Sequence, residues 1–186
     1  MARHRSIALV GGTLVVLYPF LVYWSLDILD PRVVALLLVA ATGFKFVGAR
    51  MPLSYRLVFA VGLALACALT LLTGSDLGLL LYPVLINLLL FFLFLFSWWH
   101  PPSVIESLAR LHEPDLPPAG IAYTRKVTLV WALFFALNGT LAALTIPMGR
   151  AWWTVYNGLI AYLLMGLLFS VEWLIRKKVK ADHHAV

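Results

Sequence analysis

The sequence predicts an all-α fold: a polytopic bundle of six transmembrane helices forming one integral membrane domain over residues 1–186. Of the 186 residues, 63% are hydrophobic and 12% are charged, which leaves too few polar groups to cover a water-soluble domain of this length. The hydrophobic residues occur in long runs, and a bilayer core about 30 Å thick takes roughly 20 such residues per helix. Six runs with short polar connections use most of the chain.

The first two runs are predicted at about residues 7–26 and 31–48. The first follows Arg3 and Arg5 and is longer than the roughly 7–15 apolar residues of a signal-peptide core, so we expect a retained span. Before the second run, Asp30 is suited to cap the helix and Pro31 suits its first position.

The remaining four spans are predicted by the same criterion of apolar length, and each is bounded by turn residues or interfacial aromatic residues. Gly74, Ser75 and Asp76 predict a tight turn, and Trp98 with Trp99 is typical of a membrane interface. The four spans are expected at about 57–72, 77–99, 127–146 and 152–175.

A polar loop is expected over residues 100–126. Ser103 and Glu106 have capping-box spacing, and apolar residues follow at helical intervals, so we predict a short amphipathic helix on the membrane surface. Pro114 should end this helix. Prolines 117 and 118 together with Gly120 predict extended chain from there to Lys126.

The distribution of basic residues predicts the orientation. Six alternating spans place 12 of the 14 Lys and Arg residues on one side and only Arg32 and Arg150 on the other. By the positive-inside rule, both termini, the 100–126 loop and the basic tail 176–186 are cytoplasmic. The residues on the basic side are Arg3, Arg5, Lys45, Arg50, Arg56, Arg110, Arg125, Lys126, Arg176, Lys177, Lys178 and Lys180.

Several functional classes are disfavoured. The net charge of +6 comes from span ends rather than from a basic stripe, so we expect no nucleic-acid partner. The lone Cys67 excludes an intrachain disulfide and a cysteine metal site. The polar loop contains His100, His112, Glu113 and Asp115, but their spacing matches no zinc pattern. We therefore expect no metal, no cofactor and no catalytic residue.

Polar residues inside the spans are the candidate functional residues, because they are costly in a bilayer unless paired. Helical spacing puts Asn157, Ala161, Leu164, Leu168 and Glu172 on one stripe that should face protein. One interpretation is helix packing through amide hydrogen bonds. The other is a polar cleft, open to the outer leaflet, that binds a lipid-like head group. The cleft hypothesis involves Tyr18, Tyr82, Asn87, Asn138, Tyr156 and Asn157.

Two further features leave alternatives open. Leu-Tyr-Pro occurs at Tyr18 and again at Tyr82, either as part of an inverted repeat of broken helices or by chance in a leucine-rich chain. Glu172 precedes Arg176 by four residues, which favours an ion pair and leaves a proton-relay role as the alternative.

The segments EPDLPP, YTRKVTLVWALFFALNG and WTVYNGLIAYLLMGLLFSVEW carry a family resemblance over about residues 100–176. The chain resembles small uncharacterised bacterial inner-membrane proteins associated with gene clusters for aryl polyene or related pigment lipids, made by fatty-acid-synthase-like enzymes. The resemblance implies a location in the bacterial inner membrane and a pathway, and transfers no catalytic residue. The residues that match the family pattern are Arg125, Trp131, Asn138, Gly139, Tyr156, Asn157, Gly158, Gly166 and Glu172.

The sequence and the resemblance together favour a non-enzymatic accessory protein over an enzyme. It would handle or scaffold a lipid-like acyl product among membrane lipids. Its cytoplasmic loop would dock an acidic acyl carrier protein or soluble synthases through Arg110, Arg125 and Lys126. The alternatives are a small transporter or flippase for a lipid-like substrate, and a membrane-embedded acyl-processing enzyme.

Overall fold

The computed structural model describes residues 18–46, 53–111 and 113–184, and every regular element in these ranges is helical. Predictions that fall on other residues, including the start of the first span and His112, lie outside the described part. Four of the described helices are long and apolar enough to cross a membrane, which indicates a membrane protein. They are Arg56–Thr73, Leu77–Trp99, Pro118–Thr145 and Arg150–Lys177.

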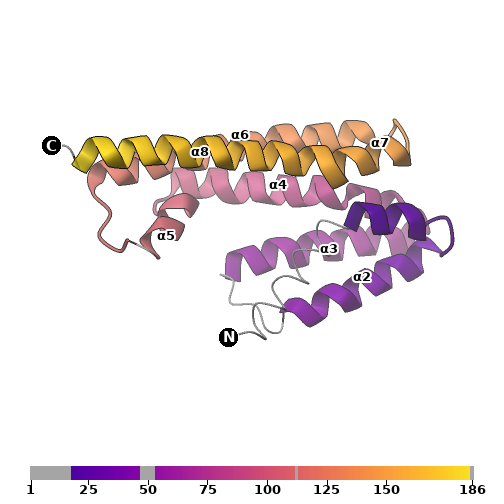
Figure 1. Ribbon diagram of the computed structural model, residues 1–186. Helices are drawn as coiled ribbons and strands as arrows, with labels where there is room; N and C mark the ends of the chain where they lie inside the picture. Colours follow the sequence, from indigo (N-terminus) through magenta and orange to yellow (C-terminus); the bar gives the residue numbers. More distant parts are fainter. Residues whose placement is uncertain (1–17, 47–52, 112, 185–186) are drawn as a thin grey trace, which may run out of the picture.

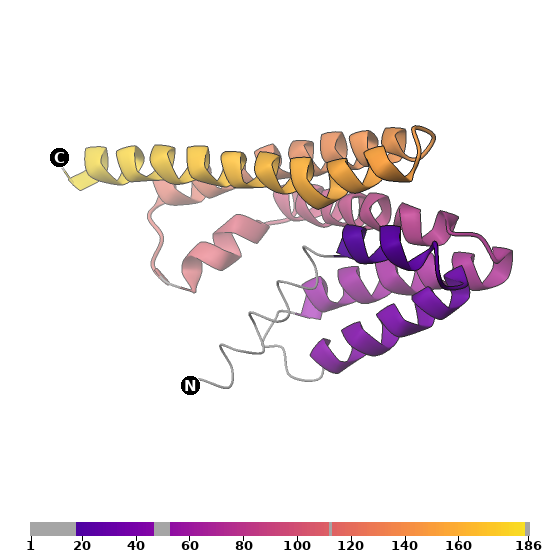
Figure 2. The ribbon, with the colours of Figure 1, turned by 45° about the vertical axis from the view of Figure 1, so that its right-hand side comes forward.

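The centre of the bundle is α4 (Leu77–Trp99), which packs against α3 (Leu53–Thr73) on one side and α6 (Pro118–Thr145) on the other. α2 (Pro31–Phe46) covers the outer side of α3 (Figure 1). A short helical segment over residues 18–25 lies alongside α3 and α4, near the ends that are joined by the turn at residues 74–76 (Figure 2). α4 can pack closely on α3 because Gly78 has no side chain, and a Cβ at this position would meet Ala66 and Thr70.

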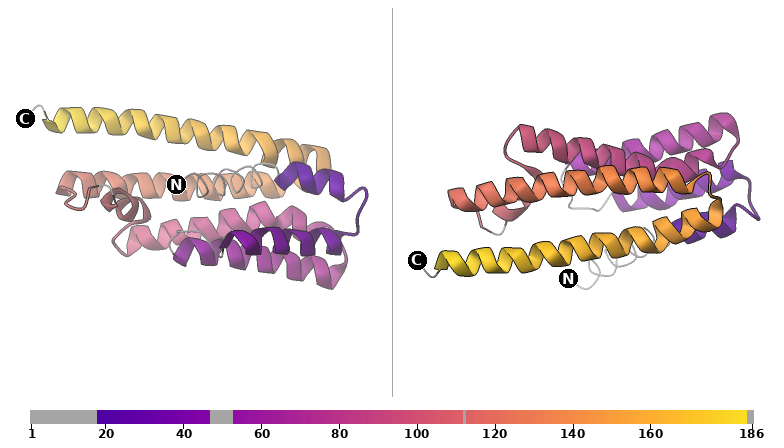
Figure 3. Two further views of the ribbon diagram at one scale, coloured as in Figure 1. Left: turned by 60° about the horizontal axis from the view of Figure 1, so that its bottom comes forward. Right: turned by 90° about the horizontal axis from the view of Figure 1, so that it is seen from above.

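The last helical rod runs back along α6. It consists of α7 (Arg150–Val155), a π-helical turn η1 (Tyr156–Ile160) and α8 (Ala161–His184). Figure 3 shows this rod beside α6, with the C-terminus at the end opposite α7. α5 (Val104–Arg110) lies at that same opposite end, outside the main row of helices (Figure 1).

An ion-pair network joins three connections at the α7 end of the bundle. Arg150 Nη1 lies 3.0 Å from Asp27 Oδ1, and Arg150 Nε lies 3.1 Å from Asp76 Oδ2. Arg32 lies beside Gly74, whose φ of +68° favours glycine. Arg32 and Arg150, the two basic residues predicted for the outer side, therefore lie at the α7 end of the bundle. Arg150 pairs there with Asp27 and Asp76.

The predicted extended chain before span 5 is wrong, because α6 begins at Pro118, nine residues before the expected start at residue 127. Proline is well tolerated in the first helical turn, where its missing N–H has no intrahelical partner to lose. Pro117 supplies the extended N-cap, with φ −66° and ψ 158°. The connection between α5 and α6 is correspondingly shorter than the predicted loop.

The predicted end of span 6 needs correction, and so does one member of its predicted protein-facing stripe. α8 continues through most of the expected basic tail, to His184. Asn157 and Ala161 are buried and Leu168 and Glu172 are half-buried, as the stripe requires. Leu164 is 38% exposed, whereas Met165 lines a cavity described below. The π turn adds a residue to one helical turn, and this rotates the following residues by about 100° relative to a regular helix. The turn therefore changes the position of Asn157 relative to α8, whereas the stripe residues from Ala161 onward keep regular α-helical spacing.

α5 forms where the capping box predicted a helix. The backbone N–H of Glu106 donates to Ser103 Oγ over 3.3 Å, and Ser97 Oγ accepts from the Val104 N–H over 3.1 Å. The Glu106 side chain does not reach back toward the cap. It is 7% exposed and pairs with Arg110 at 2.8 Å. The position of α5 on the membrane surface stays a prediction.

Candidate functional site

The candidate site is organised around a break in the hydrogen-bond ladder of α4. Pro83 lies inside α4 and has no N–H, so the carbonyl of Leu79 loses its usual partner four residues ahead. The hydroxyl of Tyr18 donates to this carbonyl over 2.8 Å. Beside it, Trp153 Nε1 donates to the carbonyl of Leu80 over 2.9 Å. Residues from the first described helical segment and from α7 thus bond to adjacent backbone carbonyls of α4.

Aromatic contacts hold these partners in place. The rings of Tyr18 and Tyr82 are 5.0 Å apart, and the rings of Tyr18 and Trp153 are 6.4 Å apart in an edge arrangement. Trp153 is 1% exposed and belongs to the hydrophobic cluster at the α7 end of the bundle. Edge and tilted geometries are the favoured ones for aromatic pairs. Two residues of the predicted cleft therefore contact each other directly.

A chain of hydrogen bonds connects three other predicted cleft residues. Tyr156 donates its hydroxyl to Asn138 Oδ1 over 2.9 Å, and Asn138 Nδ2 donates to Asn87 Oδ1 over 3.0 Å. Asn87 Nδ2 then donates to the carbonyl of Pro83 over 2.8 Å. The chain links η1, α6 and α4 and ends at the same proline that breaks the α4 ladder.

Close helix approach makes the amide bond between α4 and α6 possible. A Cβ added to Gly139 would lie 2.9 Å from Asn87 Cβ. Any larger side chain at position 139 would therefore push α4 away from α6. Gly139 thus allows α4 and α6 to approach closely enough for the Asn138 amide to bond to Asn87.

Asn157 lies in the π-helical turn. Its Nδ2 donates to the carbonyl of Trp153 over 2.9 Å, four residues earlier. The turn is closed by a bond from the Ala161 N–H to the Tyr156 carbonyl, the five-residue spacing of a π-helix. Such turns recur at functional sites in other proteins. The turn was not predicted, since no sequence signal separates it from ordinary α-helix.

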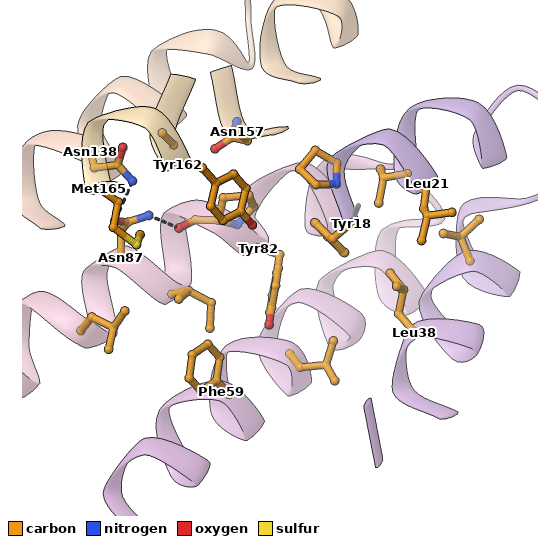
Figure 4. Close-up of a pocket in the computed structure, with 18 of the residues that line it drawn as sticks. Tyr18, Leu21, Leu38, Phe59, Tyr82, Asn87, Asn138, Asn157, Tyr162 and Met165 are labelled. Carbon is orange, nitrogen blue, oxygen red and sulfur yellow. Dashed lines mark hydrogen bonds between the residues drawn. The ribbon is translucent and has the colours of Figure 1, made fainter. Parts of the chain in front are cut away.

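These elements surround a cavity of about 590 Å³. It contains Tyr18, Tyr82, Asn87, Asn138 and Asn157 in its lining, whereas Tyr156 contacts Asn138 from outside the lining. The other described lining residues are predominantly apolar and come from residues 18–25, α2, α3, α4, α6 and α8. Figure 4 shows the hydrogen-bonded amides of Asn87 and Asn138 at one side of this space.

No family model, curated protein or solved structure matches this chain. Carboxamides and phenols form hydrogen bonds without bringing charge, and apolar side chains favour hydrocarbon. This combination is suited to binding an amphiphile.

The sequence did not single out three cavity residues, Phe59, Tyr162 and Met165. Tyr162 follows Asn157 by five residues, which in a regular α-helix places it about 140° away. The π turn brings both side chains to the same cavity. Without knowledge of that turn, the sequence assigns Tyr162 to another face.

Further candidate residues outside the cavity are Glu172 and the His, Asp and Glu residues of the predicted loop. Glu172 Oε2 accepts from Arg176 Nη2 over 3.1 Å, and the Tyr123 hydroxyl donates to Glu172 Oε1 over 3.3 Å. Among the described residues, no three His, Cys, Asp or Glu side chains lie close enough to hold a metal ion. His112, one member of the candidate loop cluster, lies outside the described residues.

The three predicted docking residues differ in availability. The Arg110 guanidinium bonds to Glu106 through Nε and Nη2 and to the Pro114 carbonyl through Nη1. Arg125 lies over the Trp98 ring, with 5.3 Å between the guanidinium carbon and the ring centroid. Lys126 is exposed. Arg125 and Lys126 are thus the better candidates for an external partner.

Proposed function

We propose that this protein is a non-enzymatic inner-membrane accessory protein that binds a lipid-like acyl molecule in the cavity beside α4. The observation that carries the proposal is the cavity itself. Its volume of about 590 Å³ falls within the range of about 300–1,000 Å³ typical of small-molecule sites. Its lining combines hydrocarbon with a few convergent amide and phenol groups, the pattern of such sites.

The proposal includes a six-span topology with cytoplasmic termini. The connections that carry Arg32 and Arg150 lie at one end of the bundle, and α5 and the end of α8 lie at the other (Figure 1). This arrangement agrees with the asymmetry of basic residues in the sequence. The aryl polyene type of product is the class that the resemblance of residues 100–176 implies.

The N-terminal part of α6 would serve as the cytoplasmic docking surface for an acidic acyl carrier protein or a soluble synthase. Arg125 and Lys126 lie in the third turn of α6, which follows the α5 segment in the sequence. A carrier docked there would deliver its acyl chain at the membrane surface. Opposite charge at the rim of an interface mainly speeds and orients association.

A transporter or flippase for a lipid-like molecule is the second candidate, and the cavity beside the intramembrane amides also favours it. A tightly packed core around Asn87, Asn138 and Asn157 would have opposed this alternative, whereas all three line the cavity. Movement of a fluorescent lipid between leaflets of proteoliposomes, above that of protein-free vesicles, would favour transport over binding alone.

Photolabelling tests the binding proposal. The protein in nanodiscs would be irradiated with a diazirine-bearing monoacyl probe, and modified peptides identified by mass spectrometry. We expect adducts on Leu90 and Met165, which line the cavity. Ile86→Trp should fill the space and reduce these adducts. Leu163 lies outside the cavity lining on α8 and is 63% exposed, so Leu163→Trp should leave the adducts unchanged. Adducts confined to lipid-facing α8 residues would refute the proposal.

A further inference from the structure

The cavity lining contains no charged side chain among the described residues that form it. An ionised phosphate, carboxylate or ammonium group would therefore enter an apolar space without a counter-charge. Burial of an unpaired charge in such surroundings is strongly unfavourable. The lining thus discriminates by charge, in addition to accepting hydrocarbon.

The polar groups of the lining divide into engaged and available ones. The hydroxyl of Tyr18 and the amides of Asn87 and Asn138 bond to other protein groups. By contrast, no described residue accepts from or donates to the Tyr82 hydroxyl or donates to Asn157 Oδ1, although both side chains line the cavity. A phenol can donate one hydrogen bond, and an amide oxygen can accept two.

The Tyr82 hydroxyl and Asn157 Oδ1, which have no partner among the described residues, come from different sides of the cavity. Tyr82 belongs to α4 and Asn157 to the π turn, and Figure 4 shows both around the central space with Tyr162. A ligand that reaches both sides needs at least one acceptor for the Tyr82 hydroxyl and one donor for Asn157 Oδ1. Hydroxyl groups supply both roles without charge.

We infer that the cavity selects an uncharged, hydroxyl-bearing amphiphile, whose polar group bonds to Tyr82 and Asn157 while its chain lies along the apolar lining. A monoacylglycerol has this chemistry. The inference rests on the proposed function and narrows it, because that function alone would admit any lipid-like acyl molecule. It also assigns Tyr82 and Asn157 a role in specificity, because their unpartnered atoms face the cavity.

Three photoreactive probes with one common acyl chain test the inference. One has a glycerol head, one a glycerol phosphate head and one a trimethylammonium head, and each is incubated with the protein in nanodiscs of zwitterionic lipid. We expect cavity adducts on Leu90 and Met165 from the glycerol probe at least tenfold above those from the charged probes. Equal cavity labelling by all three would overturn the inference and leave the proposed function intact. Labelling of the cavity by none would overturn both.

Two matched variants test the assigned residue. Tyr82→Phe keeps the ring that contacts Tyr18 and removes the hydroxyl. It should weaken binding of the glycerol probe, measured by competition, about twofold to tenfold, the change expected for one hydrogen bond. Tyr23→Phe, outside the lining, serves as the control and should bind as the wild type does. Unchanged binding by Tyr82→Phe would remove Tyr82 from the recognition of the ligand.

Discussion

The Tyr18 hydroxyl donates a 2.8 Å hydrogen bond to the Leu79 carbonyl, the acceptor that Pro83 leaves without its helical partner. Tyr18 and Leu79 are 61 positions apart in the sequence. Inside a bilayer there is no bulk water to satisfy a free carbonyl. The first described helical segment therefore completes the backbone of α4 at the point where the candidate site begins.

Tyr18→Phe should destabilise the protein by about 1–2 kcal/mol, because the Leu79 carbonyl loses its donor in an apolar region. Pro83→Ala restores a backbone N–H four residues after Leu79. The same Tyr18 substitution should therefore cost less than half as much in a Pro83→Ala background. Reversible unfolding in mixed detergent micelles measures both values. Equal costs in the two backgrounds would show that the hydroxyl does not replace the missing helical donor.

The bond between Asn138 and Asn87 predicts coupling between α4 and α6. Asn87→Ala and Asn138→Ala should each destabilise the protein, and a double-mutant cycle should give a coupling of about 0.5–1.5 kcal/mol. Thr140→Ala on α6 is the control, since its hydroxyl bonds only to Ala136 within the same helix. Additive effects of the two asparagine substitutions would argue against the bond.

The sequence was sufficient for the helical fold class and for the boundaries of α4, because a long apolar run fixes both. Five residues of the cleft hypothesis also line the cavity, and they were chosen because polar side chains in an apolar span require partners. The hydrogen-bond partners of these residues could not be predicted. The bond between Tyr18 and Leu79 depends on tertiary contact, which the spacing of Leu-Tyr-Pro does not encode.

Two errors have one physical origin, namely local backbone states that composition does not specify. Pro118 was assigned to extended chain, whereas it occupies the first turn of α6, where proline is compatible with a helix. The π turn at Tyr156–Ile160 places Tyr162 and Asn157 at the same cavity, although regular α-helical spacing would put them on different faces. A shift of one residue is enough to exchange lipid-facing and cavity-facing positions.

Gly78→Ala should cost about 1–3 kcal/mol through overpacking of α3 against α4. The added methyl would meet the Ala66 carbonyl and Thr70, including Thr70 backbone nitrogen. Gly166→Ala is the matched control, because a Cβ there has no neighbour within 4 Å. Alanine should be neutral or stabilising at 166, given its higher helix propensity. Similar unfolding free energies for the two variants would contradict the close packing at Gly78.

The proposed orientation predicts opposite labelling of two exposed sites in a Cys67→Ser background. Asp115→Cys, between α5 and α6, should react with a membrane-impermeant maleimide only after permeabilisation. Met148→Cys, 56% exposed in the turn before α7, should react in intact spheroplasts. The reverse pattern would place the loop outside the cytoplasm, and labelling of both in intact spheroplasts would refute the span count between them.

Charge reversal tests the docking surface. Replacing Arg125 and Lys126 with Glu should reduce co-purification with an acidic acyl carrier protein at least tenfold, because two attractive charges become repulsive ones. The wild-type interaction should also weaken as salt rises. Arg176→Glu and Lys177→Glu on α8 form the matched control, with the same change in net charge at the same end of the bundle. If both pairs lower recovery equally, the attraction is a general effect of charge, and docking at the start of α6 is ruled out.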